Sequence, residues 1–221
     1  MKFEDLKGFA FDLDGVIADT ARFHGQAWNE VAKKVGTEWT DELANNLKGV
    51  SRMDSLELIL KAGGHENDYS QAEKEALAEE KNNNYLKLVD TLTPADILPG
   101  IKNFLDELKA KNYKIALASA SKNAPKILKQ LQLTDYFDGI VNPADLKKGK
   151  PDPEIYLEAA KSIGLKPDQV AGIEDAQAGI AAINAAGELS IGIGESLKDA
   201  DIKFADTSEM TLEAIKERMA H

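Results

Sequence analysis

Apolar runs and amphipathic stretches alternate along most of the chain, and this alternation predicts its elements. A short apolar run between Gly8 and Gly15 predicts a buried strand. After residue 100, strands are expected at 113–119, 139–142, 169–174, 189–194 and 203–205, and helices at 101–111, 124–131, 153–163, 179–186 and 212–219. Strands that alternate with helices are typical of a mostly parallel sheet with right-handed crossovers and helices on both faces. The pattern therefore predicts an α/β fold.

Residues 20–92 have a different pattern, in which helix-forming residues dominate and β-branched runs are absent. Apolar side chains predict helices at 27–35, 56–60 and 70–92. We therefore expect an α-helical cap domain of residues 20–92, inserted into a Rossmann-like catalytic core of residues 1–19 and 93–221. Because the insertion follows the first strand, it should lie over the carboxyl ends of the strands as a lid.

Two acidic residues, Asp12 and Asp14, follow the first apolar run. Residues two apart on a strand point to the same face, and open α/β sheets bind ligands at the carboxyl ends of their strands. Like charges at short distance raise each other's pKa unless a cation lies between them. The pair therefore indicates a metal site, although Asx turns before Gly15 are an equally good explanation of the pair alone.

Further polar clusters follow later strands of the predicted sheet. The segment after residue 118 contains Ser119, Ser121, Lys122 and Asn123, where Ser121 is expected to cap the next helix. Free N–H groups at a helix start also bind phosphate, and a neighbouring hydroxyl and lysine favour it further. The capping and phosphate-binding interpretations are compatible.

The third and fourth clusters add a cation and two more acids. Lys150 lies between Gly149 and Pro151 on a stiff turn, and Asp152 is expected to cap the helix that begins at 153. Glu174 and Asp175 end an apolar strand, with helix capping by Asp175 as the alternative role. Four converging carboxylates would repel one another strongly if they were dry. Oxygen ligands of this kind favour Mg²⁺.

Composition and charge exclude several classes of function. The 221 residues include 27 basic and 38 acidic side chains, a net charge of −11, without a basic run. Neither nucleic acid nor an anionic membrane is therefore an expected partner. Cysteine is absent, which excludes disulfides and thiol catalysis, and no apolar run reaches 18 residues. We expect a cytoplasmic monomer.

Four short motifs identify a family resemblance. DLDG, LASASK, GKPDP and GIEDAQAG, in this order and spacing, resemble the motifs of the haloacid-dehalogenase superfamily of phosphoryl-transfer enzymes. The segments DLDGVIADTARFHGQAW, LKGVSRMDSL, KNNNY and TPADILPGI extend the resemblance through the insertion, to the sugar-phosphate mutases of this superfamily. The resemblance implies an Mg²⁺-dependent isomerase that interconverts β-glucose 1-phosphate and glucose 6-phosphate. An aspartyl phosphate and β-glucose 1,6-bisphosphate, the priming intermediate, would be formed on the way.

The resemblance also implies roles for residues of the core. Asp12 would be the nucleophile and Asp14 the general acid and base. Mg²⁺ would be held by Asp12, the backbone carbonyl of Asp14 and Asp175, with Glu174 nearby. The transferring phosphoryl group would be held by Ser119, the Ala120 N–H and Lys150. Ala176 departs from the serine that is common in the family, which we expect to affect the metal little.

In the insertion, the resemblance implies a second phosphate site and a sugar site. Arg52 would hold the phosphate that does not react, together with Ser121, Lys122 and Asn123 of the core. The other expected substrate-binding residues are Lys48, Gly49, Val50, Ser51, Ser55 and Lys81. Thr20 and His24 would couple lid closure to the position of Asp14.

Simpler roles for these residues remain open. His24 is otherwise a packed helix histidine, Ser51 a helix cap, and Lys48 and Lys81 ordinary surface charges. The alternatives to a mutase are a sugar-phosphate phosphatase, which would use the same core, and a phosphosugar-binding regulator without activity. The presence of both Asp12 and Asp14 argues against the regulator, because binding alone does not need a nucleophile.

Overall fold

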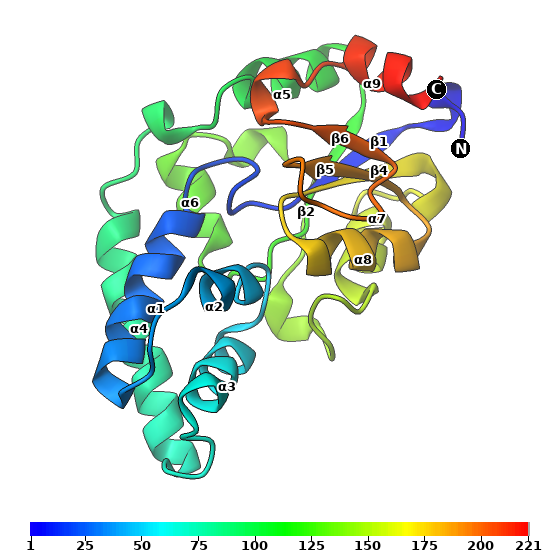
Figure 1. The fold of residues 1–221 in the computed structure, drawn as a ribbon. Coiled ribbons are helices and arrows are strands. Elements are labelled where there is room, and N and C mark those ends of the chain that lie inside the picture. The colour runs from blue at the N-terminus through cyan, green and yellow to red at the C-terminus, as the bar shows by residue number, and fades with distance from the viewer. Residues whose placement is uncertain (221) are drawn as a thin grey trace.

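A parallel six-stranded sheet forms the centre of the protein, as a computed structural model of residues 1–220 shows (Figure 1). The strand order is β3-β2-β1-β4-β5-β6. The strands are β1 (Gly8–Phe11), β2 (Lys114–Leu117), β3 (Gly139–Ile140), β4 (Val170–Glu174), β5 (Leu189–Ile193) and β6 (Ile202–Phe204). Starting from β1, the chain adds β2 and β3 on one side of this strand and then β4, β5 and β6 on its other side. Sheets of this kind bind ligands at the point where the strand order changes direction, which here is beside β1.

Helices cover both faces of the sheet (Figure 1). Because successive side chains of a strand point to opposite faces, Phe9 and Phe11 pack in one apolar cluster and Ala10 in another. The first cluster includes α5 (Ile101–Ala110), α6 (Ala124–Gln130) and α9 (Leu212–Met219). The second includes α7 (Glu154–Ser162) and α8 (Gln177–Ala186). The strands are therefore buried from both sides.

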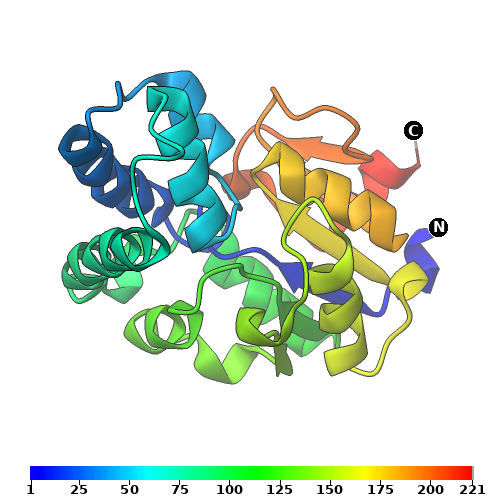
Figure 2. The ribbon, with the colours of Figure 1, turned by 90° about the horizontal axis from the view of Figure 1, so that it is seen from below.

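Four of the helices between β1 and β2 form a separate group beside the sheet (Figures 1 and 2). They are α1 (Ala21–Val35), α2 (Asp41–Asn46), α3 (Arg52–Gly63) and α4 (Gln71–Val89). Their inner faces make their own apolar cluster, which includes Trp28, Ile59 and Leu77. One end of this group packs on the main core through Phe23 and Tyr85. We refer to this group as the cap.

Short 3₁₀ turns occupy several of the connections. Their bounds are Phe3–Asp5, Pro94–Asp96, Thr134–Tyr136, Pro143–Asp145, Pro167–Gln169 and Thr207–Glu209. Within residues 1–220, none of the helices combines the length and apolar character that crossing a bilayer requires.

The predicted fold class, an α/β core with an inserted helical cap, is confirmed. The domain boundaries at 19/20 and 92/93 remain a prediction. Helix α2 was not predicted, because it is short and its single buried side chain, Leu43, gives no periodic signal.

Three residues considered as helix caps lie one or two positions before the residue that precedes the helix. Asn123 precedes α6, and the Ser121 hydroxyl instead accepts a bond from the Asn123 N–H. Pro153 precedes α7, while Asp152 accepts from the Glu154 N–H. Ala176 precedes α8, so the Asp175 carboxylate is not used for capping.

Candidate active site

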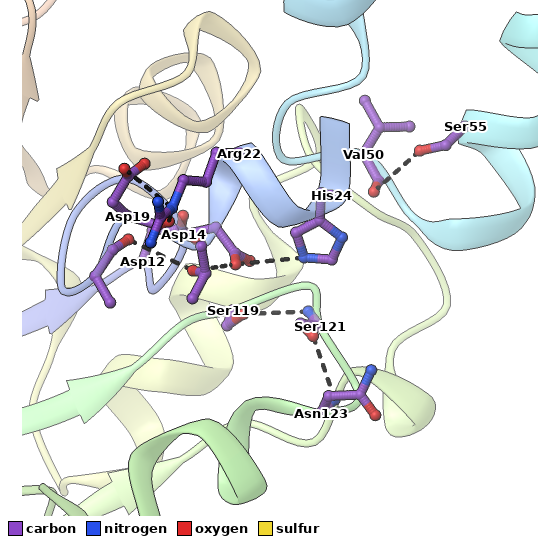
Figure 3. A network of polar contacts seen from close by, with 12 residues as sticks. Asp12, Asp14, Asp19, Arg22, His24, Val50, Ser55, Ser119, Ser121 and Asn123 are labelled. Atoms are coloured by element: carbon purple, nitrogen blue, oxygen red, sulfur yellow. Dashed lines mark hydrogen bonds and ion pairs between the residues drawn. The ribbon is translucent and has the colours of Figure 1, made fainter. Parts of the chain in front are cut away.

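Asp12 and Asp14 lie directly after β1, where the chain leaves the sheet and turns back on itself. The Asp12 N–H donates to the Ile173 carbonyl at 3.0 Å, which extends the β1–β4 ladder by one residue. The backbone of Gly15 is left-handed, with φ +80°, and its N–H donates to the Ala18 carbonyl at 2.8 Å. Figure 3 shows both aspartates in the same region of the site.

Lys150 is buried against Asp12 and Glu174. Its Nζ lies 2.9 Å from Asp12 Oδ1 and 3.0 Å from the Ala118 carbonyl, and it also donates to Glu174 Oε1. Burial opposes the charged form of Lys150, but the negative charges of Asp12 and Glu174 outweigh this and raise its pKa. Glu174 also accepts from the Tyr156 hydroxyl at 3.0 Å. Lys150 is therefore a fixed cation beside the expected nucleophile.

Three carboxylates gather around this lysine. Asp12, Glu174 and Asp175 offer oxygens that lie within 4.8 Å of one another. Burial raises the pKa of Asp12, and burial together with the charge of Glu174 raises the pKa of Asp175 to about 7. One lysine does not balance three acids, and an oxygen-only cluster with excess negative charge fits a hard divalent cation such as Mg²⁺. The Asp14 carboxylate is outside this cluster.

Two motif glycines make the cluster possible. A Cβ at Gly15 would lie 2.2 Å from Asp175 Oδ2, and a Cβ at Gly179 would lie 1.9 Å from Glu174 Cδ. Each glycine therefore allows a carboxylate to pack directly on the backbone. The glycines of the DLDG and GIEDAQAG motifs are explained by this close approach.

The Asp14 side chain points toward His24 of the cap (Figure 3). Its Oδ1 accepts from the Thr20 hydroxyl at 2.6 Å and lies 3.3 Å from His24 Nε2. His24 Nδ1 lies 2.7 Å from Lys81 Nζ. A lysine ammonium can only donate, so His24 Nδ1 accepts and His24 Nε2 carries the proton toward Asp14.

The pKa values along this chain of contacts follow from burial and charge. Burial would raise the pKa of Asp14, but His24 and the Thr20 hydrogen bond outweigh it, so the pKa is lowered. Burial lowers the pKa of His24, and it lowers the pKa of Lys81 to about 7. The ring of Tyr85 stacks on His24 with centroids 4.1 Å apart. The Asp14 carboxylate is thus held ionised and oriented by residues of the cap.

The segment after β2 brings hydroxyl and N–H groups to the same edge of the sheet. The Ser121 N–H donates to Ser119 Oγ at 3.1 Å, and the Asn123 N–H donates to Ser121 Oγ at 3.2 Å. Ser119 is buried, whereas Ala120 and Lys122 line the neighbouring cavity.

Arg52 begins α3 and approaches the core from the cap. Ser51 caps this helix by accepting from the Asp54 N–H at 3.3 Å, which is the simpler role that its capping pattern indicated. The Arg52 guanidinium donates to Asn82 Oδ1 at 2.8 Å, and Asn123 of the core donates to the same oxygen at 2.9 Å. Arg52 and Asn123 are therefore brought together from opposite sides.

A single cavity of about 680 Å³ connects these groups between the cap and the core. The predicted residues that line it are Asp12, Asp14, His24, Lys48, Gly49, Val50, Ser51, Arg52, Ser55, Lys81, Ala120, Ser121, Lys122, Asn123 and Asp175. Four predicted residues do not line the cavity, and all four are buried: Thr20, Ser119, Lys150 and Glu174. The structure therefore brings most of the predicted residues to one cavity, and their roles stay predictions.

The sequence analysis missed several polar residues of the site, three of which make close contacts with predicted residues. Asn82 contacts Arg52, Tyr85 stacks on His24 and Tyr156 donates to Glu174. Asn82 and Tyr85 belong to the KNNNY segment that carried the resemblance, immediately after Lys81 and one turn later. Tyr156 gave no signal, because its spacing in α7 is that of a core residue.

Comparison with known proteins establishes the class. The chain belongs to the haloacid dehalogenase-like hydrolases, whose family model matches residues 6–187. Within this family it is 47% identical to the β-phosphoglucomutase of Bacillus subtilis, over 96% of this chain and 95% of that protein. It is also 32% identical to a phosphorylated carbohydrates phosphatase of Thermotoga maritima, over 88% of each chain. The resemblance inferred from the motifs is confirmed.

A solved structure supports the same relationship. The β-phosphoglucomutase of Clostridium difficile superposes with a TM-score of 0.94 at 46% identity, covering 97% of each chain. The likeness therefore includes the cap as well as the sheet.

Proposed function

We propose that this chain is a β-phosphoglucomutase, an isomerase that interconverts β-glucose 1-phosphate and glucose 6-phosphate. The observation that supports the proposal most directly is that one cavity is lined both by the expected nucleophile, Asp12, and by the expected phosphate-anchoring residues. These residues are Arg52, Lys122 and Asn123. A mutase that works through a bisphosphate needs one reactive phosphate site and one anchoring site. Arginine suits the anchoring site because its planar guanidinium binds phosphate in a bidentate manner.

The reaction divides the work between the two aspartates. Phosphorylated Asp12 transfers its phosphoryl group to the 6-hydroxyl of β-glucose 1-phosphate, and Asp14 takes the proton of this hydroxyl. β-Glucose 1,6-bisphosphate then turns over in the cavity. Its C1 phosphoryl group returns to Asp12, Asp14 returns the proton to the leaving oxygen, and glucose 6-phosphate remains. Because its pKa is lowered, Asp14 is ionised and therefore able to take the proton of the hydroxyl.

Charge neutralisation supports the attack on phosphorus. The buried ammonium of Lys150 lies 2.9 Å from Asp12, where it also offsets the charge of a phosphoryl group. Ser119 and the Ala120 N–H hold the same group. Asp12, Asp175 and the Asp14 carbonyl would hold Mg²⁺, with Glu174 nearby, and the ion would supply further positive charge for the attack.

The cap, proposed as a lid of residues 20–92, has to exclude water, because hydrolysis of the aspartyl phosphate would end the cycle. Asp12 is only 4% exposed in this structure. Gly49 of the cap lies close to Lys150, since a Cβ built on it would be 3.7 Å from Lys150 Cδ. Closure of the cap therefore brings its backbone to the phosphoryl-transfer centre.

A product assay tests the proposal against the phosphatase alternative. The purified protein is given Mg²⁺, β-glucose 1-phosphate and a trace of β-glucose 1,6-bisphosphate, and both glucose 6-phosphate and inorganic phosphate are measured. We expect glucose 6-phosphate as the main product. Inorganic phosphate as the main product would support a phosphatase instead, and no product from any sugar phosphate would support a binding protein.

The remaining features of the proposal are small-molecule sugar phosphates as partners, without nucleic acid or membrane, a monomeric state and a cytoplasmic location. Size-exclusion chromatography of the purified protein tests the monomeric state directly.

A further inference from the structure

The side-chain amide of Asn82 connects the cap to the core. Its Oδ1 accepts two hydrogen bonds, from Arg52 Nη2 at 2.8 Å and from Asn123 Nδ2 at 2.9 Å. A guanidinium has only donors, so the amide atom that faces Arg52 is the oxygen. Arg52 and Asn82 belong to the cap helices α3 and α4, whereas Asn123 precedes α6 of the core. One oxygen atom thus joins three segments that are far apart in the sequence.

The two donors to this oxygen are the groups proposed to anchor the phosphate that does not react. Asn82, Arg52 and Asn123 all line the cavity. Arg52 has five N–H donors, and its bond to Asn82 leaves four free for a phosphate. The hydrogen bond to Asn82 fixes the plane of the guanidinium, and the bond to Asn123 fixes the separation between cap and core.

We propose that Asn82 is a positioning residue for the anchoring phosphate site, and that it aligns Arg52 with Asn123 while the cap is closed. This inference rests on the proposed function, because it assumes a substrate with a second phosphate. Asn82 acts through its two partners rather than on the reacting atoms. Replacing Asn82 should therefore weaken the binding of substrates that carry an anchoring phosphate and leave the binding of other substrates unchanged.

The two following asparagines provide matched controls on the same helix. Asn83 is exposed. Asn84 donates to Glu30 Oε2 at 2.9 Å, a contact between α4 and α1 that lies entirely within the cap. Replacing either residue by alanine makes the same chemical change as Asn82→Ala without breaking the link between cap and core.

The experiment compares Asn82→Ala with Asn83→Ala and Asn84→Ala on two phosphoryl donors in the presence of Mg²⁺. β-Glucose 1,6-bisphosphate carries both phosphates, and acetyl phosphate lacks the anchoring one. We expect Asn82→Ala to raise KM for the bisphosphate roughly tenfold, as loss of a hydrogen bond to a charged group implies, with a smaller change in kcat. KM for acetyl phosphate should stay within about twofold of the controls.

A second variant separates positioning from a purely structural role. Asn82→Asp keeps the acceptor oxygen and the shape of the side chain, but it adds a negative charge beside the anchoring site. We expect Asn82→Asp to raise KM for the bisphosphate, and we expect this increase to become smaller as ionic strength rises. KM for acetyl phosphate should again be unaffected. An unchanged KM for the bisphosphate in both variants, or an equal loss on both donors, would overturn the inference.

Failure of this inference is distinguishable from failure of the proposed function. The product formed by the unmodified protein decides between mutase and phosphatase, whatever the Asn82 variants do. Conversely, the KM contrast between the two donors can be measured for either activity, since both begin with transfer of phosphorus to Asp12.

Discussion

Asp12 and Asp14 are two residues apart, yet their side chains have different surroundings. Asp12 faces Lys150 at 2.9 Å and shares a cluster with Glu174 and Asp175. Asp14 instead accepts a hydrogen bond from Thr20 and lies beside His24. The first environment suits a nucleophile next to a cation, and the second suits a group that exchanges a proton. The difference between them arises from the turn at residues 13–18.

At this scale, we expect Asp14→Asn to slow phosphoryl transfer by about 10² to 10⁴-fold, the usual effect of losing a general acid and base. The asparagine can still accept the Thr20 hydrogen bond, but it cannot take a proton. Turnover of β-glucose 1-phosphate measures the loss, and titration calorimetry with Mg²⁺ measures metal binding. Metal affinity should be nearly unchanged, and an equal fall in metal affinity would contradict the assigned role.

Helix α8 and strand β5 meet at a buried acid that the proposed reaction does not use. Glu188 follows Gly187, the left-handed residue that ends α8, and precedes β5. It is only 5% exposed, and neither carboxylate oxygen has a hydrogen-bond partner among residues 1–220. Burial raises the pKa of Glu188 to about 9. It lies at the amino end of β5, at the edge of the sheet opposite the candidate active site.

The raised pKa makes the contact between α8 and β5 sensitive to pH. Folded Glu188 retains its proton between about pH 4.5 and 9, where the unfolded chain has lost it, so stability falls as pH rises through this window. Glu188→Gln does not titrate at this position. From pH 5 to pH 8, we therefore expect its free energy of unfolding to rise by roughly 2 to 4 kcal/mol relative to that of the unmodified protein. Urea unfolding at both pH values measures this.

The exposed residue Glu195 supplies the control for this prediction, since Glu195→Gln should follow the unmodified protein at both pH values. A free-energy difference between Glu188→Gln and the unmodified protein that does not change with pH would show that Glu188 is not held protonated.

The elements also show what a sequence can and cannot predict. Apolar periodicity predicted every strand and all helices except α2, because buried faces leave a period in the sequence. The charged motif residues were predicted because they follow strands whose carboxyl ends meet at one edge. The role of Asn82 was not predicted, because its hydrogen-bond partners are 30 and 41 residues away and these contacts form only when the cap docks on the core. Nor did Glu188 signal its burial, since a lone glutamate after a glycine is typical of an exposed turn.

On the scale of the whole molecule, one metal site would join segments that are far apart in the chain. Asp12 follows β1, while Glu174 ends β4 and Asp175 comes directly after it. These central strands carry the core, and the turn after β1 leads through Thr20 into the cap. Binding of a divalent ion at this position would therefore stabilise the sheet edge from which the cap extends.

We expect Mg²⁺ to raise the melting temperature, because three clustered carboxylates, two of them buried, are balanced by only one lysine in the cluster. A ligand at one hundred times its dissociation constant adds about 2.7 kcal/mol, which corresponds to roughly 5–10 °C for a chain of this size. Thermal unfolding with Mg²⁺, with EDTA, and with NaCl at equal ionic strength measures the shift.

Two variants locate the source of this stabilisation. Asp175→Asn removes one carboxylate of the cluster, so it should abolish most of the Mg²⁺-dependent shift and raise the melting temperature without metal, because repulsion falls. Asp14→Asn should retain the shift, because its side chain faces His24 instead. Full activity in EDTA, or the same shift in Asp175→Asn as in the unmodified protein, would exclude this cluster as the metal site.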